Sequence, residues 1–286
     1  MVLETNGRVC YNTGIEETER DMERTKIGVF DSGLGGLTVL NEICRYNDGL
    51  DIIYFGDTAR VPYGSRSPET IARYAEQDVR FLLAQGVEAI VIACGTVSAT
   101  CIDLLRGRYR IPILGVIEPA ASEAVRMTKT GHIGVLGTKA TVQSGAYAKE
   151  IGRVSEGKRV TGVACPLFVP LIENGFAEDD PITLLTVERY LAPIRNTDID
   201  TLILGCTHYP FLTNAIGAFL PGVRLLNIGT ALAQKLSHAI PLQKNDAPSD
   251  VAYYVSDDDA SFRSIANARL DAIPAGVVQK INIESY

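Results

Sequence analysis

Two apolar segments of the chain end in the same way, with a cysteine followed within two places by a threonine. The first is VIACGTVSA at 91–99, which carries Cys94, and the second is LILGCTHYP at 202–210, which carries Cys206. One cysteine at such a place is usually a small packing residue. Two cysteines in matched surroundings indicate a shared chemical role.

A pair of opposed thiols fits one reaction particularly well. Inverting a carbon that bears an acidic proton needs a base on one face and an acid on the other, and these roles exchange in the reverse direction. A thiol, with an ordinary pKa of about 8.5, can serve in either role. Neighbouring threonine hydroxyls and backbone N–H groups can hold carboxylates and stabilise the developing charge. We therefore expect Cys94 and Cys206 to approach one ligand from opposite sides.

The segments around these cysteines alternate in character. Short runs rich in isoleucine and valine are separated by amphipathic or capped segments, which is typical of βαβ units in a parallel sheet. The expected strands form two sets, residues 26–30, 51–55, 88–93 and 111–117, and then 132–137, 159–164, 200–205 and 223–227. Later runs at 251–255 and 277–283 are expected to complete the first set. The clearest helix begins after Ser67, with Pro68 in its first turn, and ends before Gly86.

We therefore predict an α/β protein with two similar, doubly wound units. The first unit comprises 26–117 and 230–286, the second comprises 118–229, and residues 1–25 form an N-terminal arm. Ligands of open parallel sheets bind outside the carboxyl ends of the strands, so two thiols approach one ligand from opposite sides if the two units face each other. The residues that follow the strands are Asp31, Ser32, Gly33, Gly56, Asp57, Cys94, Gly95, Thr96, Gly137, Thr138, Cys206, Thr207 and His208.

The composition of the chain limits the classes of partner that it is expected to bind. The 286 residues are 46% hydrophobic and carry a formal net charge of −7, which argues against nucleic acid or an anionic membrane as a partner. The first 26 residues lack the apolar core of a secretory signal, and no run approaches the roughly 18 apolar residues of a membrane span. A cytoplasmic location is therefore expected. Without C-x-x-C motifs or cysteine–histidine clusters, neither a metal site nor a disulfide framework is predicted. Four cysteines are expected to be buried free thiols: Cys10, Cys44, Cys101 and Cys165.

Two further segments could be misread as ligand motifs. DSGLGGLTVL is similar to a phosphate-binding loop, but Thr38 replaces the third glycine of G-x-G-x-x-G and no G-K-[ST] follows. A tight turn from strand to helix, which exposes Asp31 and Ser32, is expected instead. His208 has no partner at metal-ligand spacing, so we expect it to form hydrogen bonds or to assist an acid.

The chain resembles the glutamate racemases. It carries, in order, VFDSGLGGLTVL, YFGDTARVPYG, VIACGTVSA, GVIEPA, IGVLGTKAT, CPLFVPLIENG and LILGCTHYP. The likeness extends from about residue 26 to residue 230. It implies interconversion of L- and D-glutamate without a cofactor, as a supply of D-glutamate for peptidoglycan. It also implies two α/β domains related by pseudo-twofold symmetry, with the active site between them, and a homodimer.

The resemblance also implies roles for individual residues. Cys94 and Cys206 would be the catalytic acid/base groups, facing D-glutamate and L-glutamate respectively. Asp31 would act beside the substrate amino group and the first thiol, and His208 and Glu173 would assist the second thiol. The residues expected to contact the substrate are Asp31, Ser32, Tyr63, Gly64, Gly95, Thr96, Thr138, Thr141, Thr207 and His208.

Two positions depart from the family pattern. Family members usually have Cys-Asn-Thr where this chain has Cys94, Gly95 and Thr96, so only a backbone N–H remains for a substrate carboxylate. Restoring the amide by Gly95→Asn is expected to lower KM, since a hydrogen bond to a charged group contributes about 1.5–3 kcal/mol. NIGTALA at 227–233 replaces a usual Asp-Ser-Gly, and no role is predicted for Asn227.

Other functions stay open at this level. An aspartate or hydantoin racemase would share the cysteine pair, although GCTHYP and PYG favour glutamate. A two-lobed sensor that binds an amino acid without converting it would not need the thiols. A structural or interaction protein would leave the paired cysteines unexplained.

Overall fold

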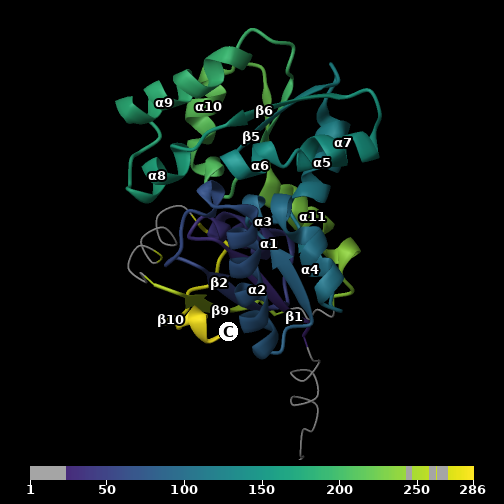
Figure 1. Cartoon of the computed structure of the whole chain (residues 1–286), viewed down its shortest axis with the longest axis vertical. Helices are drawn as coiled ribbons and strands as arrows, with labels where there is room; N and C mark the ends of the chain where they lie inside the picture. The colour runs from purple at the N-terminus through teal and green to yellow at the C-terminus, as the bar shows by residue number, and fades with distance from the viewer. Residues whose placement is uncertain (1–23, 243–246, 258–261, 263–269) are drawn as a thin grey trace, which may run out of the picture.

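The computed structural model describes residues 24–242, 247–257, 262 and 270–286. Its strands lie in two sheets, and the strand pairs in both sheets are parallel. The sheets belong to two lobes that follow one another along the long axis of the molecule (Figure 1). We call the lobe that contains the N-terminal strand the first lobe and the other the second lobe.

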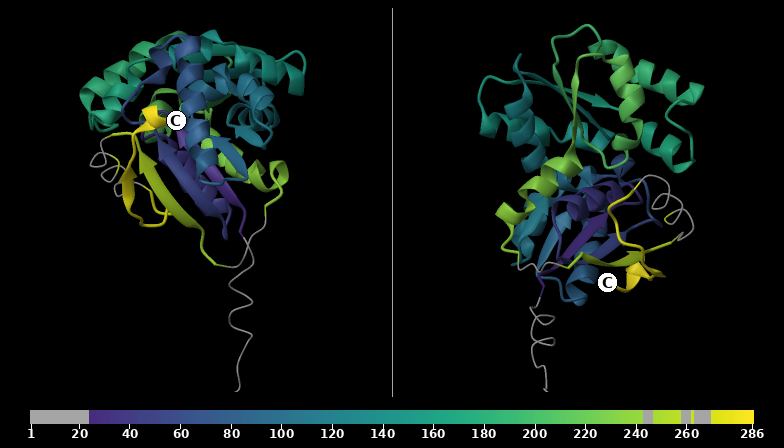
Figure 2. Two further views of the ribbon diagram at one scale, coloured as in Figure 1. Left: turned by 60° about the horizontal axis from the view of Figure 1, so that its bottom comes forward. Right: turned by 180° about the vertical axis from the view of Figure 1, so that it is seen from behind.

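The sheet of the first lobe has the strand order β10-β9-β2-β1-β3-β4. Its strands are β1 (Lys26–Asp31), β2 (Asp51–Gly56), β3 (Ala89–Ile92), β4 (Ile113–Gly115), β9 (Asp250–Val255) and β10 (Val278–Lys280). The late strands β9 and β10 therefore join the early ones, as the runs at 251–255 and 277–283 predicted. Figure 2 shows them, in yellow-green and yellow, at one edge of this sheet.

The sheet of the second lobe has the order β6-β5-β7-β8. Its strands are β5 (His132–Gly137), β6 (Arg159–Ala164), β7 (Thr201–Leu204) and β8 (Arg224–Asn227). This order repeats β2-β1-β3-β4, because the first strand of each set lies between the second and the third. Cys94 follows β3 and Cys206 follows β7, so the two cysteines occupy equivalent places in the repeat. The predicted two-unit α/β fold is confirmed.

The α-helices of the described residues connect these strands. They are α1 (Gly36–Tyr46), α2 (Pro68–Ala84), α3 (Gly95–Thr100), α4 (Ile102–Arg108), α5 (Ile117–Met127), α6 (Lys139–Gln143), α7 (Ala146–Val154), α8 (Phe168–Glu173), α9 (Pro181–Leu191), α10 (Thr213–Phe219) and α11 (Ile228–Ala239). The helix predicted after Ser67 is α2, and the Ser67 side chain accepts the N–H of Thr70 at 3.3 Å. Gly86, just past its end, has a φ of +74°, which glycine adopts most readily.

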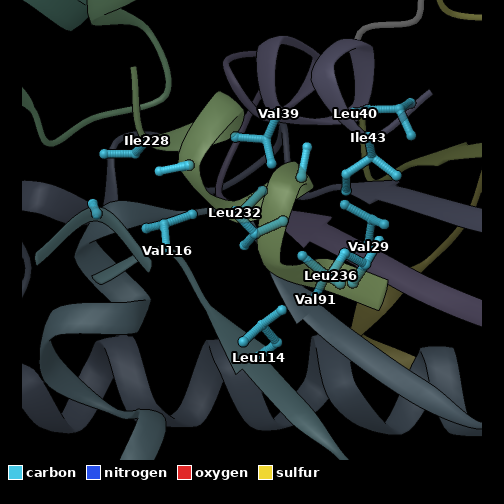
Figure 3. Close-up of a cluster of buried hydrophobic side chains, with 14 of the residues drawn as sticks. Val29, Val39, Leu40, Ile43, Val91, Leu114, Val116, Ile228, Leu232 and Leu236 are labelled. Carbon is cyan, nitrogen blue, oxygen red and sulfur yellow. The ribbon is translucent and has the colours of Figure 1, made fainter. Parts of the chain in front are cut away.

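Helix α11 follows β8, the last strand of the second lobe, and packs into the core of the first lobe. Its residues Leu232 and Leu236 pack with Val39 and Ile43 of α1 and with Val29 of β1 (Figure 3). Each fully buried side chain of this kind contributes about 1.5–3 kcal/mol to the stability of the folded state. Helix α11 also contacts α5, the helix that follows the last strand of the first set.

The start of α11 explains a position to which the sequence assigned no role. The side-chain Oδ1 of Asn227 accepts the N–H of Gly229 at 2.8 Å and so caps the helix. Cys44, Cys101 and Cys165 are buried free thiols, as predicted. Cys10 lies outside the described residues, as does the predicted arm except for its last two residues. Within the described ranges, no helix is long and apolar enough to cross a membrane.

Candidate active site

The two cysteines of the repeated ending are buried where the lobes meet. Their side chains are 3% and 7% exposed for Cys94 and Cys206 respectively. The backbones next to them touch, because a Cβ atom added to Gly95 would lie 2.2 Å from the carbonyl oxygen of Gly205. The carboxyl ends of β3 and β7 therefore face each other closely.

The Cys94 thiol lies in the first lobe, at the N-terminus of α3. Its Sγ donates a hydrogen bond to Oγ of Ser32 at 3.3 Å. Burial, and then the negative charge of Asp31, raise the pKa of Cys94 to about 12, although the bond to Ser32 opposes this shift. Without a ligand, Cys94 is therefore a neutral thiol at pH 7 and can donate a proton.

The Cys206 thiol has a different set of neighbours. Nδ1 of His208 lies 3.9 Å from its Sγ, and Nε2 of His208 lies 3.0 Å from Oε1 of Glu173 at the end of α8. Burial lowers the pKa of His208, but the hydrogen bonds and charges of Cys206 and Glu173 outweigh it and raise this pKa to about 10. The imidazole is therefore protonated at pH 7, and a positive charge lies beside the Cys206 sulfur.

Asp31 is the last residue of β1 and supplies a negative charge. Its carboxylate accepts the N–H of Gly33 at 3.0 Å and the hydroxyl of Thr207, from the second lobe, at 3.3 Å. Burial raises the pKa of Asp31 to about 6, although the charge of His208 and these hydrogen bonds oppose the shift. At pH 7 the carboxylate form prevails and can pair with a ligand ammonium group.

The predicted exposure of Asp31 is wrong, although that of Ser32 is partly correct. Ser32 is half-buried, whereas Asp31 is fully buried. The reason is the close approach of α1, since a Cβ atom at Gly36 would lie 2.3 Å from Cβ of Asp31. The turn from β1 to α1 is as tight as predicted, and this tightness covers the carboxylate.

Three threonine hydroxyls form a row across the two lobes. Oγ1 of Thr96 lies 3.0 Å from Oγ1 of Thr138, which lies 2.9 Å from Oγ1 of Thr141. Thr138 also caps α6 by accepting the N–H of Thr141 at 3.2 Å. Such hydroxyls can turn to donate to a carboxylate, because a hydroxyl group is both donor and acceptor.

Tyr63 does not present its hydroxyl to this row. Its side chain is buried in the first lobe, where the hydroxyl donates to Asp57 and lies 3.2 Å from Oδ2 of Asp78. A ligand contact of Tyr63 must therefore involve its backbone. The next residue does reach the second lobe, since a Cβ atom at Gly64 would lie 2.4 Å from Cβ of Thr138.

Sequence reasoning missed several residues that shape the site. Thr38 donates its hydroxyl to the carbonyl oxygen of Thr207 at 2.8 Å and so links the lobes. Asp57 and Asp78 lie beside the Tyr63 hydroxyl, and Arg60 donates to both of these carboxyl groups. The only available signal was the position of Thr38, Asp57 and Arg60 inside DSGLGGLTVL and YFGDTARVPYG.

Together these groups provide two thiols, a carboxylate, an imidazolium and a row of hydroxyls. That set can move protons on a small zwitterion, with the ammonium beside Asp31 and the carboxylates beside the threonines. Among the residues that the structure describes, no three His, Cys, Asp or Glu side chains are grouped as metal ligands.

Comparison with known proteins gives a consistent result. The profile of the Asp/Glu/hydantoin racemase family matches residues 29–236. The glutamate racemase of Geobacter metallireducens is 42% identical over 264 residues, which cover 91% of this chain and 97% of the relative. The crystal structure of Thermus thermophilus glutamate racemase with β-chloro-D-alanine has a TM-score of 0.80 at 42% identity and covers 92% of this chain and 98% of its own. The structure of Francisella tularensis glutamate racemase with D-glutamate has a TM-score of 0.84 at 35% identity, with 91% and 98% coverage.

Proposed function

The chain belongs to the Asp/Glu/hydantoin racemase family and is a glutamate racemase, and we propose that it inverts the α-carbon of glutamate with Cys94 and Cys206 as opposed acid/base groups. One observation carries this proposal. The two cysteines follow equivalent strands of a repeated unit, and their backbones meet at Gly95 and Gly205. When two equivalent units face each other, equivalent groups at the ends of their strands lie on opposite faces of one ligand.

The reaction balances with one thiolate and one thiol. With L-glutamate, the Cys206 thiolate removes the α-proton, and the electron pair of the C–H bond moves onto the α-carbon and its carboxylate. The Cys94 thiol then gives its proton to the opposite face, so D-glutamate forms and Cys94 becomes the thiolate. The next D-glutamate can be converted back from that state.

The charges around the two thiols support this assignment of the base and the acid. The high pKa of Cys94 suits a proton donor, and the His208 cation stabilises negative charge on the Cys206 sulfur during turnover. In the reverse direction Cys94 must act as the base. A substrate ammonium paired with Asp31 offsets the negative charge that disfavours the Cys94 thiolate, so substrate binding prepares this base.

The remaining predicted residues hold the substrate in this proposal. Asp31 and Ser32 lie at the amino group, and Glu173 supports His208. The groups that hold the two carboxylates are the N–H of Gly95, the hydroxyls of Thr96, Thr138, Thr141 and Thr207, and the backbone of Tyr63 and Gly64.

The cellular role and the assembly are part of the same proposal. We infer that the enzyme needs no cofactor, forms a homodimer and works in the cytoplasm, where D-glutamate enters peptidoglycan synthesis. Residues 26–117 with 230–286 and residues 118–229 would act as two domains that close on the substrate. The relatives named glutamate racemase support the chemistry from which these inferences start.

Incubation of the purified protein with each enantiomer of glutamate tests the substrate. Optical rotation should decay to zero from either L- or D-glutamate, and it should change much more slowly with aspartate. Faster conversion of aspartate would favour the aspartate racemase alternative. Binding of glutamate, by calorimetry, without any change in rotation would favour the sensor and refute the proposal.

A further inference from the structure

A cluster of buried charges lies in the first lobe, next to Tyr63. It consists of Asp57, which follows β2, Arg60 in the next turn, and Asp78 in α2. The two aspartates are fully buried, and the Arg60 side chain is only 9% exposed. Burying charges is costly, and the proton transfer proposed above uses none of these groups.

We propose that Asp57, Arg60 and Asp78 are positioning residues of the racemase, which fix Tyr63 and Gly64 against Thr138 and thereby set the affinity for substrate. The inference rests on the proposed function, because it takes Thr138 to hold a substrate carboxylate.

The guanidinium of Arg60 joins the turn after β2 to helix α2. Its Nε donates to Oδ2 of Asp57 at 2.6 Å, and its Nη2 donates to Oδ1 of Asp78 at 3.1 Å. Its central carbon lies 4.2 Å from the ring centre of Tyr74. A planar guanidinium that donates in several fixed directions holds the turn after β2 more rigidly than an ammonium group can.

The Tyr63 hydroxyl lies between the two aspartates. It donates to Asp57 and lies 3.2 Å from Oδ2 of Asp78, so its single proton is shared between two acceptors. Burial and the charge of Asp57 raise the pKa of Asp78 well above its usual range. The Arg60 cation, which donates to both carboxyl groups, opposes this shift.

The chain continues directly from this cluster to the substrate site. Tyr63 begins the short 3-10 helix η1 (Tyr63–Ser65), and Gly64 packs against Thr138. Thr138 in turn contacts the hydroxyls of Thr96 and Thr141. If the turn shifts, the row of threonines shifts, whereas the hydrogen-bond partners of the two thiols are Ser32 and His208. Loss of the cluster should therefore raise KM and leave kcat almost unchanged.

The variants Asp78→Leu, Arg60→Lys and Tyr63→Phe remove, respectively, the buried carboxyl group of Asp78, the planar donor and the hydroxyl alone. Each should raise KM for both enantiomers about tenfold, as expected when one hydrogen bond to a charged group is lost, with kcat within about threefold. Asp78→Asn should restore KM relative to Asp78→Leu, because an amide at this position can still accept from Arg60 and form a hydrogen bond with the Tyr63 hydroxyl.

Glu284→Gln is the matched control. Glu284 contacts the same Arg60 at 3.3 Å, but its side chain is 66% exposed, so this variant should change KM by less than about twofold. Tyr63→Phe keeps the ring packing against Tyr74 and tests the inference even if Asp78→Leu does not fold.

Two results would overturn the inference. One is an unchanged KM in folded Arg60→Lys and Tyr63→Phe, and the other is a fall in kcat at constant KM, which would mean that the cluster acts on the thiols. Failure of the wild-type protein to convert glutamate would instead refute the proposed function. The same variants would then be compared by their Kd for D-glutamate, where a tenfold weakening supports the positioning role and an equal Kd refutes it.

Discussion

One added methyl group should separate the thiols of Cys94 and Cys206. A Cβ atom at Gly95 would lie 2.2 Å from the carbonyl oxygen of Gly205, whereas ordinary contact begins at 3.4 Å. The carbonyl group is backbone and the position of a Cβ atom is fixed by its own backbone, so neither can rotate away, and Gly95→Ala must move the lobes apart by about 1 Å. Gly95 adjoins Cys94 and Gly205 adjoins Cys206, so this movement acts directly on the thiols.

The expected loss of racemisation rate follows from this movement of the lobes. A misplacement of about 1 Å can cost about 100-fold in rate, which corresponds to about 2.7 kcal/mol of transition-state stabilisation. We therefore expect Gly95→Ala to lower kcat about 100-fold. The close contact also corrects the expectation for Gly95→Asn. The amide cannot reach a substrate carboxylate without the same opening of the lobes, so this variant should lower kcat/KM rather than lower KM.

Initial rates of racemisation by circular dichroism, for L- and D-glutamate, measure this effect. Gly107→Ala is the control, because a Cβ atom at this position in α4 meets no atom within 4 Å. It should retain the wild-type kcat and gain a little stability, since alanine favours a helix more than glycine does. A folded Gly95→Ala variant with kcat within threefold of the wild type would refute the reasoning.

Three other predictions concern single groups of the site. Asp31 has a pKa of about 6 and is neutral below it. We therefore expect kcat/KM to fall about tenfold per pH unit below pH 6. The variant Asp31→Asn should not show this fall. His208→Asn should lower kcat/KM about 100-fold for both enantiomers alike, because Cys206 is the proposed base in one direction and the proposed acid in the other; an unchanged kcat/KM would contradict the role of His208. Thr38→Val should lower the free energy of unfolding by about 1–3 kcal/mol in urea titrations, because it leaves the buried carbonyl of Thr207 unpaired, and an unchanged value would disprove that link.

Local patterns were enough to predict the elements of this fold. The strands and the helix α2 depend on runs of apolar residues, a capping serine and a glycine at the helix end, all within a few neighbouring positions. The paired cysteines were found in the same way, because each follows a strand directly. Even the return of β9 and β10 to the first sheet was visible as two apolar runs left over at the end of the chain.

The details of the site depend on contacts between distant segments and could not be predicted. Asp31 is covered by α1 and bonded by Thr207, which is 176 positions away. The narrow space at Gly95 arises from a carbonyl group in the other lobe. The Tyr63 hydroxyl is held between Asp57 and Asp78, and the place of Asp78 in α2 gave no hint of this contact. Such features follow from packing between elements and leave no local pattern.

Proton exchange in D2O by single-cysteine variants tests the two-base mechanism most directly. Cys94→Ala and Cys206→Ala should each stop racemisation in both directions, because every turnover needs one base and one acid. Cys94→Ser, which keeps Cys206, should exchange the α-proton of L-glutamate for deuterium without inversion. Cys206→Ser should do so only with D-glutamate. The proton NMR signal of the α-hydrogen and the optical rotation, followed together, distinguish exchange from inversion. Racemisation at a near wild-type rate by either folded alanine variant would contradict the two-base mechanism.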